Sequence, residues 1–239
     1  MRVVIAIPAR IGSTRLPAKA LAEIAGEPMV VRVWRRCDAV PGVVRVLVAT
    51  DDARIRDAVR AAGGEAVLTR AEHPSGTDRI AEAVRGEVCD LVINVQGDEP
   101  FIEPGPLQAL IAACEAAPDA EAATLATELA EPTDLDNPSV VKVRVGEDGC
   151  ALWFSRRPPE ESRRDCLRHI GVYAYRPDFL QRFTTLAPTA GELSERLEQL
   201  RILEHGHRIL VVRTAWEPLA VDTPEDLERA RQRAAREKR

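Results

Sequence analysis

The first strand-like segment constrains the fold more than any other part of the chain. Residues 3–7 read Val-Val-Ile-Ala-Ile, without a polar residue to face solvent. Strands of this kind are buried on both faces, which is typical of the parallel sheets of α/β proteins. We expect Pro8 to end the pairing, because proline has no N–H to donate to a neighbouring strand.

Later segments continue this alternation of strands and helices. A helix that begins at Pro28 leads to a strand at 43–50, and Asp51 and Asp52 can cap the helix that follows. Further strands are expected at 65–68, 91–95, 121–127, 168–175 and 209–213. This order predicts an α/β fold with a mostly parallel sheet that carries helices on its faces.

Two segments in the second half have a different pattern. Residues 139–145 and 150–155 read as paired strands, because the intervening Gly-Glu-Asp-Gly is typical of a hairpin turn. The leucines of 193–201 have helical spacing and predict one helix that packs on the core.

Length and composition are typical of one large α/β domain that spans residues 1–239. The chain is 45% hydrophobic, enough for a sizeable core, and its net charge of −5 argues against a nucleic-acid partner. Its five cysteines form no C-x-x-C pair, which is typical of reduced thiols. No signal-like segment opens the chain and no apolar run approaches ~18 residues, so we expect a soluble cytoplasmic protein without a membrane partner.

The loop after the first strand is rich in groups that bind phosphate. It holds three cations, Arg10, Arg15 and Lys19, while Ser13 adds a hydroxyl and Gly12 a flexible backbone. Each charge-assisted hydrogen bond is worth roughly 1.5–3 kcal/mol, so several that converge on a polyanion give useful affinity. A solvated surface loop is the alternative. No G-x-G-x-x-G follows the strand, which argues against a NAD-dependent oxidoreductase.

Two acidic residues are candidates for facing the same site. Asp98 follows the strand at 91–95 and therefore lies at the carboxyl edge of the predicted sheet, where ligands bind in open α/β folds. Mg²⁺ prefers a few carboxylate oxygens, with phosphates and water completing its shell. The alternative is that Asp98 only ends the strand or caps the next helix. Asp222 precedes the expected cap Thr223 of the last helix, whose charged tail beyond Ala230 we expect to fray.

Six motifs resemble those of the CMP-Kdo synthetases, cytidylyltransferases that activate 3-deoxy-manno-octulosonate for lipopolysaccharide. They are PARIGSTRLPAKAL (8–21), TRAEHPSGTDR (69–79), NVQGDEP (94–100), RHIGVYAY (168–175), LEQLR (197–201) and VDTPEDLE (221–228). The resemblance implies a Rossmann-like nucleotide-diphospho-sugar transferase fold with a small β-hairpin and helix appendage at 139–205. By the same resemblance, this appendage binds the acceptor and pairs with a second subunit in a homodimer.

The resemblance also implies a reaction and its residues. CTP and an acidic acceptor, first of all 3-deoxy-manno-octulosonate, would give the CMP-acceptor and pyrophosphate. The implied catalytic residues are Arg10, Arg15 and Lys19, and Asp98 and Asp222 would hold Mg²⁺. CTP would also contact Ala9, Ser13, His73, Ser75 and Gly76. The acceptor would contact Arg79, Gln96, Arg156, His169, Tyr173, Glu198 and Gln199.

Some of these residues also have simpler interpretations. His73 precedes a proline and can be a turn residue, and Ser75 can be a helix cap. Lys142, in a segment that resembles N-P-x-x-V-K-V of the family, is either a further site candidate or a solvated lysine on a strand.

One departure from the family leaves other functions open. Residues 157–167 are shorter than the family's segment, contain no aromatic residue and hold three arginines. This favours a smaller or more anionic acceptor, such as phosphonoformate in phosphonate natural-product biosynthesis. A nucleotide-sensing protein without turnover is a further alternative, against which the intact Arg15, Lys19, Asp98 and Asp222 argue.

Overall fold

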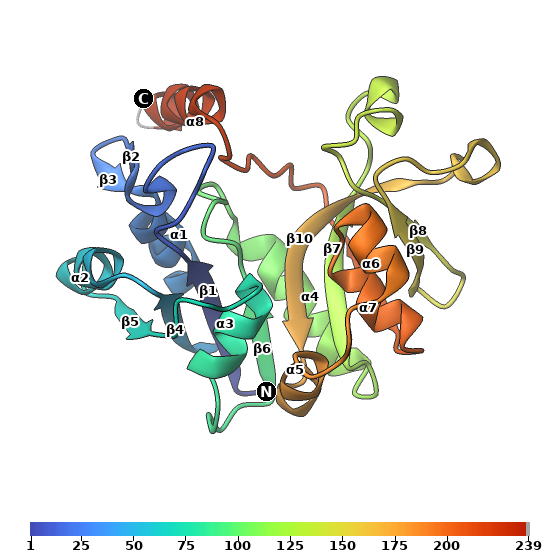
Figure 1. Cartoon of the computed structure of the whole chain (residues 1–239), viewed down its shortest axis with the longest axis horizontal. Helices are drawn as coiled ribbons and strands as arrows, with labels where there is room; N and C mark the ends of the chain where they lie inside the picture. The colour runs from blue at the N-terminus through green and yellow to red at the C-terminus, as the bar shows by residue number, and fades with distance from the viewer. Residues whose placement is uncertain (238–239) are drawn as a thin grey trace. The chain divides into compact units, whose positions relative to one another are not determined.

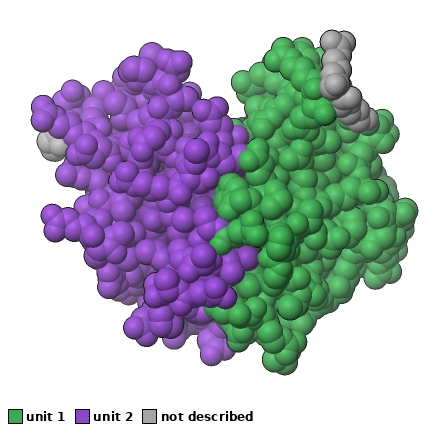
Figure 2. All heavy atoms as spheres, turned by 180° about the vertical axis from the view of Figure 1, so that it is seen from behind, with its two compact units in different colours: residues 1–108, 218–239 green, residues 109–217 purple. Residues whose placement is uncertain are grey.

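The computed structural model describes residues 1–237, which form two compact units (Figures 1 and 2). The first unit comprises residues 1–108 and the C-terminal segment from Pro218, and the second comprises residues 109–217. The chain passes from the first to the second within helix α4 (Pro104–Ala116). Within residues 1–237, no helix combines the length and the apolar character needed to cross a membrane.

The first unit contains a parallel sheet in the order β6-β1-β4-β5. Its strands are β1 (Val3–Ala9), β4 (Val43–Thr50), β5 (Glu65–Leu68) and β6 (Leu91–Asn94). Its helices include α1 (Met29–Asp38), α2 (Ala53–Ala61) and α3 (Gly76–Ala83), and the short elements η1 (Lys19–Leu21), β2 (Glu23–Ile24) and β3 (Glu27–Pro28) precede α1. Residues 4–7 are fully buried, which confirms the parallel sheet predicted from the apolar runs.

The prediction that Pro8 ends the first strand is wrong. β1 continues to Ala9, and its pairing with β4 extends to Ala9 opposite Thr50. Its pairing with β6 stops at Ala6 opposite Asn94. Pro8 therefore lies where β1 is paired with β4 alone, and proline is tolerated at such edge-like positions.

The last helix, α8 (Pro224–Glu237), is longer than expected (Figure 1). The prediction that its charged tail frays after Ala230 is wrong for the residues up to Glu237, which are helical. Two of its alanines are buried in a hydrophobic cluster. The Glu237 carboxylate accepts hydrogen bonds from Arg32 and Arg36 of α1, at 2.6 and 2.8 Å. Packing and ion pairing together order the end of the helix.

The second unit contains a mixed sheet. Its strands are β7 (Ala122–Thr127), β8 (Lys142–Val145), β9 (Ala151–Ser155), β10 (Leu167–Tyr175) and β11 (Ile209–Arg213). β11 is parallel to β7, β10 is antiparallel to β7, and β8 is antiparallel to both β9 and β10. The Gly146 N–H donates to the Cys150 carbonyl at 2.8 Å, which confirms the predicted hairpin turn. The helical elements are η2 (Pro132–Leu135), η3 (Glu160–Ser162), α5 (Pro177–Phe183), α6 (Ala190–Glu195) and α7 (Gln199–Glu204).

The helix predicted over 193–201 is interrupted. α6 ends at Glu195, and Arg196 adopts a left-handed conformation with φ of 55° before α7 begins at Gln199. The Glu195 carboxylate accepts hydrogen bonds from Ser155 Oγ at 2.8 Å and from the Arg156 N–H at 3.0 Å. These contacts with the end of β9 fix the place where α6 stops, so leucine spacing alone gave too long a helix.

Candidate active site

A pocket of about 440 Å³ opens in the first unit, beyond the carboxyl ends of β1 and β6. Its volume lies within the range of small-molecule sites. Its lining includes every residue expected to contact CTP or Mg²⁺, namely Ala9, Arg10, Ser13, Arg15, Lys19, His73, Ser75, Gly76, Asp98 and Asp222, together with Arg79 and Gln96. Segments far apart in the sequence thus form one site.

Two glycines allow these segments to approach one another. A Cβ atom on Gly97 would lie 2.8 Å from the backbone oxygen of Pro8, closer than real Cβ atoms come. A Cβ atom on Gly76 would lie 3.1 Å from Cγ of Pro8. The end of β1 therefore depends on both glycines for its contacts with the loop after β6 and with the start of α3. Sequence reasoning singled out Gly76 but missed Gly97, whose place beside Asp98 in NVQGDEP was the available signal.

One wall of the pocket carries a cluster of opposite charges. Lys19 Nζ lies 2.6 Å from Oδ2 of Asp98 and 2.9 Å from Oδ1 of Asp222. The same Asp222 oxygen lies 2.9 Å from the Arg15 guanidinium. Burial alone would lower the pKa of Lys19, but the two carboxylates outweigh burial and raise it. Lys19 is therefore an ammonium ion at neutral pH.

The backbone holds the two carboxylates in place. The Val221 N–H donates to the Asp98 carbonyl at 2.9 Å, so the segments that carry Asp98 and Asp222 are joined directly. Oδ2 of Asp226 accepts from the N–H groups of Asp222 and Thr223, at 3.1 and 3.0 Å. The Asp226 N–H in turn donates to Thr223 Oγ1 at 3.2 Å, which confirms Thr223 as the cap of α8.

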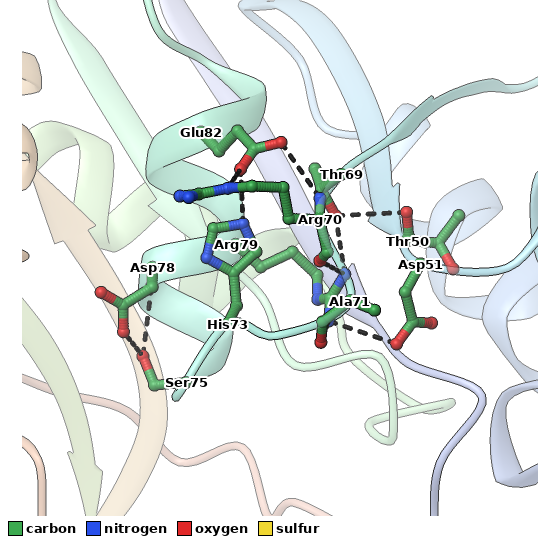
Figure 3. Close-up of polar contacts among 10 residues, drawn as sticks. All are labelled: Thr50, Asp51, Thr69, Arg70, Ala71, His73, Ser75, Asp78, Arg79 and Glu82. Atoms are coloured by element: carbon green, nitrogen blue, oxygen red, sulfur yellow. Dashed lines mark hydrogen bonds and ion pairs between the residues drawn. The ribbon is translucent and has the colours of Figure 1, made fainter.

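Arg79 is part of the pocket lining. Figure 3 shows its side chain among backbone and side-chain oxygens. It donates to Thr69 Oγ1 at 2.6 Å, to the Arg70 carbonyl at 3.1 Å and to Asp51 Oδ2 at 3.3 Å. The other Asp51 oxygen accepts from the Ile11 N–H at 3.0 Å. The pair of Arg79 and Asp51 therefore ties the loop after β5 to the cationic loop.

This arrangement gives Arg79 a structural role in addition to the predicted one. Its side chain is only 3% exposed and its hydrogen bonds go to the protein, while its contact with an acceptor stays a prediction. Asp51 was expected only as a possible helix cap, and its place at the carboxyl end of a buried strand was the signal that it lies near the site.

His73 and Ser75 are both held by their neighbours (Figure 3). His73 Nε2 lies 2.7 Å from Glu82 Oε2, and its side chain is only 4% exposed. Hydrogen bonding from Arg70 lowers the pKa of Glu82, which therefore stays ionised beside the imidazole. Ser75 caps α3, because its Oγ accepts from the Asp78 N–H at 3.1 Å and donates to the Asp78 carboxylate at 2.6 Å. The expected cap is confirmed, and both residues also line the pocket.

The remaining acceptor candidates lie in the second unit. Burial of its imidazole lowers the pKa of His169 to about 3, so the ring is neutral at neutral pH. Its Nε2 lies 3.0 Å from Thr124 Oγ1, and its ring packs against Phe154 and Tyr173, with centroids 5.0 and 5.5 Å away. Burial, and then the charge of Glu198, raise the pKa of Tyr173.

Side-chain donors of Arg156 have hydrogen-bond acceptors in the protein, whereas the amide nitrogen of Gln199 has none among the described residues. The Arg156 guanidinium donates to the carbonyls of Glu195 and Pro138, both at 2.9 Å. Gln199 is 5% exposed, and its Nε2 is buried without a hydrogen-bond acceptor among the described residues. A buried amide donor without a partner is rare and calls for a ligand or water.

Lys142 is not the solvated strand lysine that was one alternative. It is fully buried, and its ammonium donates to the carbonyls of Asn137, Val140 and Arg156 at 2.9, 2.8 and 2.6 Å. Burial lowers its pKa. Lys142 therefore fixes the segment before β8 against the end of β9.

Comparison with solved structures first defines the fold class of the chain. The fold is similar to that of 4-diphosphocytidyl-2C-methyl-D-erythritol synthase from Anaerococcus prevotii, with a TM-score of 0.66 at 13% identity, over 100% of this chain and 99% of that chain. At this identity the likeness shows the fold alone, which is the predicted α/β nucleotide-transferase fold.

Closer relatives define the family. A profile described as cytidylyltransferase matches residues 4–209. Proteins named 3-deoxy-manno-octulosonate cytidylyltransferase are similar over nearly the whole chain: that of Geobacter metallireducens is 45% identical over 251 residues, 99% of each protein, and that of Anaeromyxobacter dehalogenans 49% over 236 residues, 96% of each. A solved CMP:2-keto-3-deoxy-manno-octonic acid synthetase complexed with CTP is 42% identical, with a TM-score of 0.94 over 99% of this chain and 100% of that one. The chain belongs to the cytidylyltransferase family.

Proposed function

We propose that this chain transfers CMP from CTP to 3-deoxy-manno-octulosonate and releases pyrophosphate, which supplies the activated sugar acid for lipopolysaccharide. The observation that carries the proposal is the pocket of the first unit, which all three loop cations line and in which Arg15 and Lys19 contact two carboxylates. The relatives named for this reaction, at 44–49% identity, favour this acceptor over a phosphonate and favour turnover over nucleotide sensing.

The cations of the loop bind the triphosphate in this proposal. Arg10, Arg15 and Lys19 line the pocket together with the Ser13 hydroxyl. Each charge-assisted hydrogen bond to phosphate fixes the nucleotide and neutralises the negative charge that develops on the departing pyrophosphate. Catalysis then depends on the positions and charges of these side chains more than on a general base.

The carboxylates fit a bound Mg²⁺. Oxygens of Asp98 and Asp222 both reach one point, which Lys19 Nζ marks, and carboxylate oxygens are the ligands that Mg²⁺ prefers. The described residues contain no group of three or more His, Cys, Asp or Glu side chains suited to a metal, so phosphate and water would complete the shell. When bound, Mg²⁺ would polarise the α-phosphate and favour loss of the acceptor's hydroxyl proton.

The acceptor contacts in this proposal are those that the motifs imply. Arg79 and Gln96 line the pocket of the first unit, and His169, Tyr173, Arg156, Glu198 and Gln199 belong to the second. The buried Gln199 Nε2 supports this role, because an acceptor oxygen would satisfy it. Assembly as a homodimer and a location in the cytoplasm are further parts of the proposal.

The test is pyrophosphate release from CTP and Mg²⁺ by the purified protein, with 3-deoxy-manno-octulosonate, with phosphonoformate and without acceptor. Release only with the sugar acid is expected. Asp98→Asn should lower its rate by roughly 100-fold, the scale for one preorganised electrostatic group, whereas the exposed Glu103→Gln, with the same change of charge, should not. Release with phosphonoformate alone, or none with either acid, would overturn the proposal.

A further inference from the structure

Lys19 lies where the proposed reaction needs a divalent cation. Its ammonium contacts Asp98 at 2.6 Å and Asp222 at 2.9 Å, and its side chain is only 18% exposed. The proposed function gives the two carboxylates to Mg²⁺ and Lys19 to the triphosphate. In the structure these groups are paired with one another instead.

The backbone places Lys19 for this pairing. Ala18, just before it, has a left-handed conformation with φ of 51° and ψ of 36°, which is costly for a residue with a Cβ atom. The Lys19 N–H donates to the Leu16 carbonyl at 3.1 Å, and its own carbonyl accepts from Ala22 at 3.1 Å. The start of the side chain is therefore fixed, and its four-carbon stem lets the ammonium move between partners.

We propose that Lys19 is an internal counter-ion that occupies the divalent-cation position until the nucleotide binds, so that metal and nucleotide enter the pocket together. This inference rests on the proposed function. Without a cation between them, the carboxylates of Asp98 and Asp222 would repel each other, and the ammonium removes that repulsion.

The exchange of partners gives coupling between the two ligands. A metal ion alone must displace the ammonium and leave it without an acceptor in a partly buried place, which costs free energy. Phosphate oxygens offer Lys19 new acceptors and release the carboxylates for the metal. Because such coupling is reciprocal, metal should improve nucleotide binding by the same factor.

The first measurement is Mn²⁺ binding to the protein without nucleotide, detected by electron paramagnetic resonance. Lys19→Met should bind Mn²⁺ roughly ten- to hundredfold more tightly than the unmodified chain, the scale on which one opposite charge at 4–6 Å shifts an ionic equilibrium. Lys19→Arg keeps the charge and should bind as weakly as the unmodified chain. Arg10→Met is the matched control, because Arg10 lines the same pocket but forms no ion pair within residues 1–237.

The second measurement is CTP binding in the presence of EDTA. Asp222→Asn removes the carboxylate charge that pairs with Arg15 and one of the two that pair with Lys19, and it should tighten metal-free CTP binding roughly tenfold. Glu103→Gln changes the net charge equally from an exposed position and should have little effect. Thermal melts of all variants establish that each one is folded.

The outcomes separate this inference from the proposed function. Adding Asp98→Asn to Lys19→Met should abolish the tight Mn²⁺ binding, which places the ion at the carboxylates. If Lys19→Met binds Mn²⁺ no more tightly while Asp98→Asn still weakens binding with nucleotide present, the counter-ion role is wrong and the metal site stands. If neither aspartate affects Mn²⁺ binding, the metal site and the counter-ion role are both wrong.

Discussion

Acidification from pH 7 to pH 5 should destabilise this protein through His169. The imidazole lies against Phe154 and Tyr173 and next to Thr124 Oγ1, and its burial lowers the pKa to about 3. The Tyr173 phenol has a raised pKa and stays neutral, and no carboxylate forms an ion pair with His169 among the described residues. Nothing therefore favours protonation of this ring in the native state.

The sign and size follow from proton linkage. The unfolded chain binds a proton at His169 below its ordinary pKa of about 6.5, whereas the native protein binds one only near 3. The stability due to the neutral ring is complete above pH 6.5 and is lost as the pH falls towards 3. At ~1.4 kcal/mol per pH unit, the loss between pH 7 and pH 5 is about 2 kcal/mol, an upper value because the residue keeps some solvent exposure.

The assay is urea unfolding at both pH values for the unmodified chain and for His169→Gln, which can still hydrogen-bond to Thr124 but does not titrate. Carboxylates with lowered pKa values, such as that of Glu192 beside Arg201, also make the protein less stable in acid. Both proteins contain them, so their effect cancels in the comparison. The unmodified chain should lose about 2 kcal/mol more than the variant. Equal losses, or a native His169 resonance that titrates near pH 6.5, would refute the reasoning.

Two further predictions concern glycines. Gly97→Ala should lower kcat/KM for CTP by roughly 10- to 100-fold, because its Cβ atom would displace the Pro8 backbone beside the pocket. Gly105→Ala is the control, because no atom lies within 4 Å of its new Cβ at the start of helix α4. It should keep full activity, and its free energy of unfolding should rise by about 0.4–1 kcal/mol. Equal rates for both variants would contradict the packing argument. Gly64→Ala should destabilise the protein by about 1–3 kcal/mol in thermal or urea unfolding, because its Cβ atom would lie 2.7 Å from the Trp34 ring. An unchanged unfolding midpoint would show that the ring moves freely.

The parallel strands were predicted well from the sequence, because a short run of apolar residues is enough to indicate a buried strand. Residues 65–68 and 209–213 match the observed strands at both ends. Pro8 was misread because the pairing of β1 depends on the lengths of two other strands, β4 and β6. The end of α6 was missed because the groups that bond to Glu195 lie about 40 residues earlier in the chain.

In the candidate site, too, the individual residues could be predicted from the sequence, but their contacts with distant residues could not. Lys19, Asp98 and Asp222 were each selected from a motif, and the structure brings them together although 79 and 203 residues separate Lys19 from the two carboxylates. Their pairing with one another could not be predicted, because a motif names a residue without naming its partner. The link from Asp51 to Arg79 was likewise missed, since it depends on how two loops meet in space.

The long separation of Lys19 from Asp222 has a consequence during synthesis. The ribosome releases the cationic loop before the segment that carries Asp222, because Asp222 follows Lys19 by 203 residues. At about 5–20 residues per second, Lys19 would wait roughly 10–40 s for its second carboxylate. A nascent chain that ends before Pro218 therefore carries an incomplete pocket, and the pocket is complete only once the segment with Asp222 has been made.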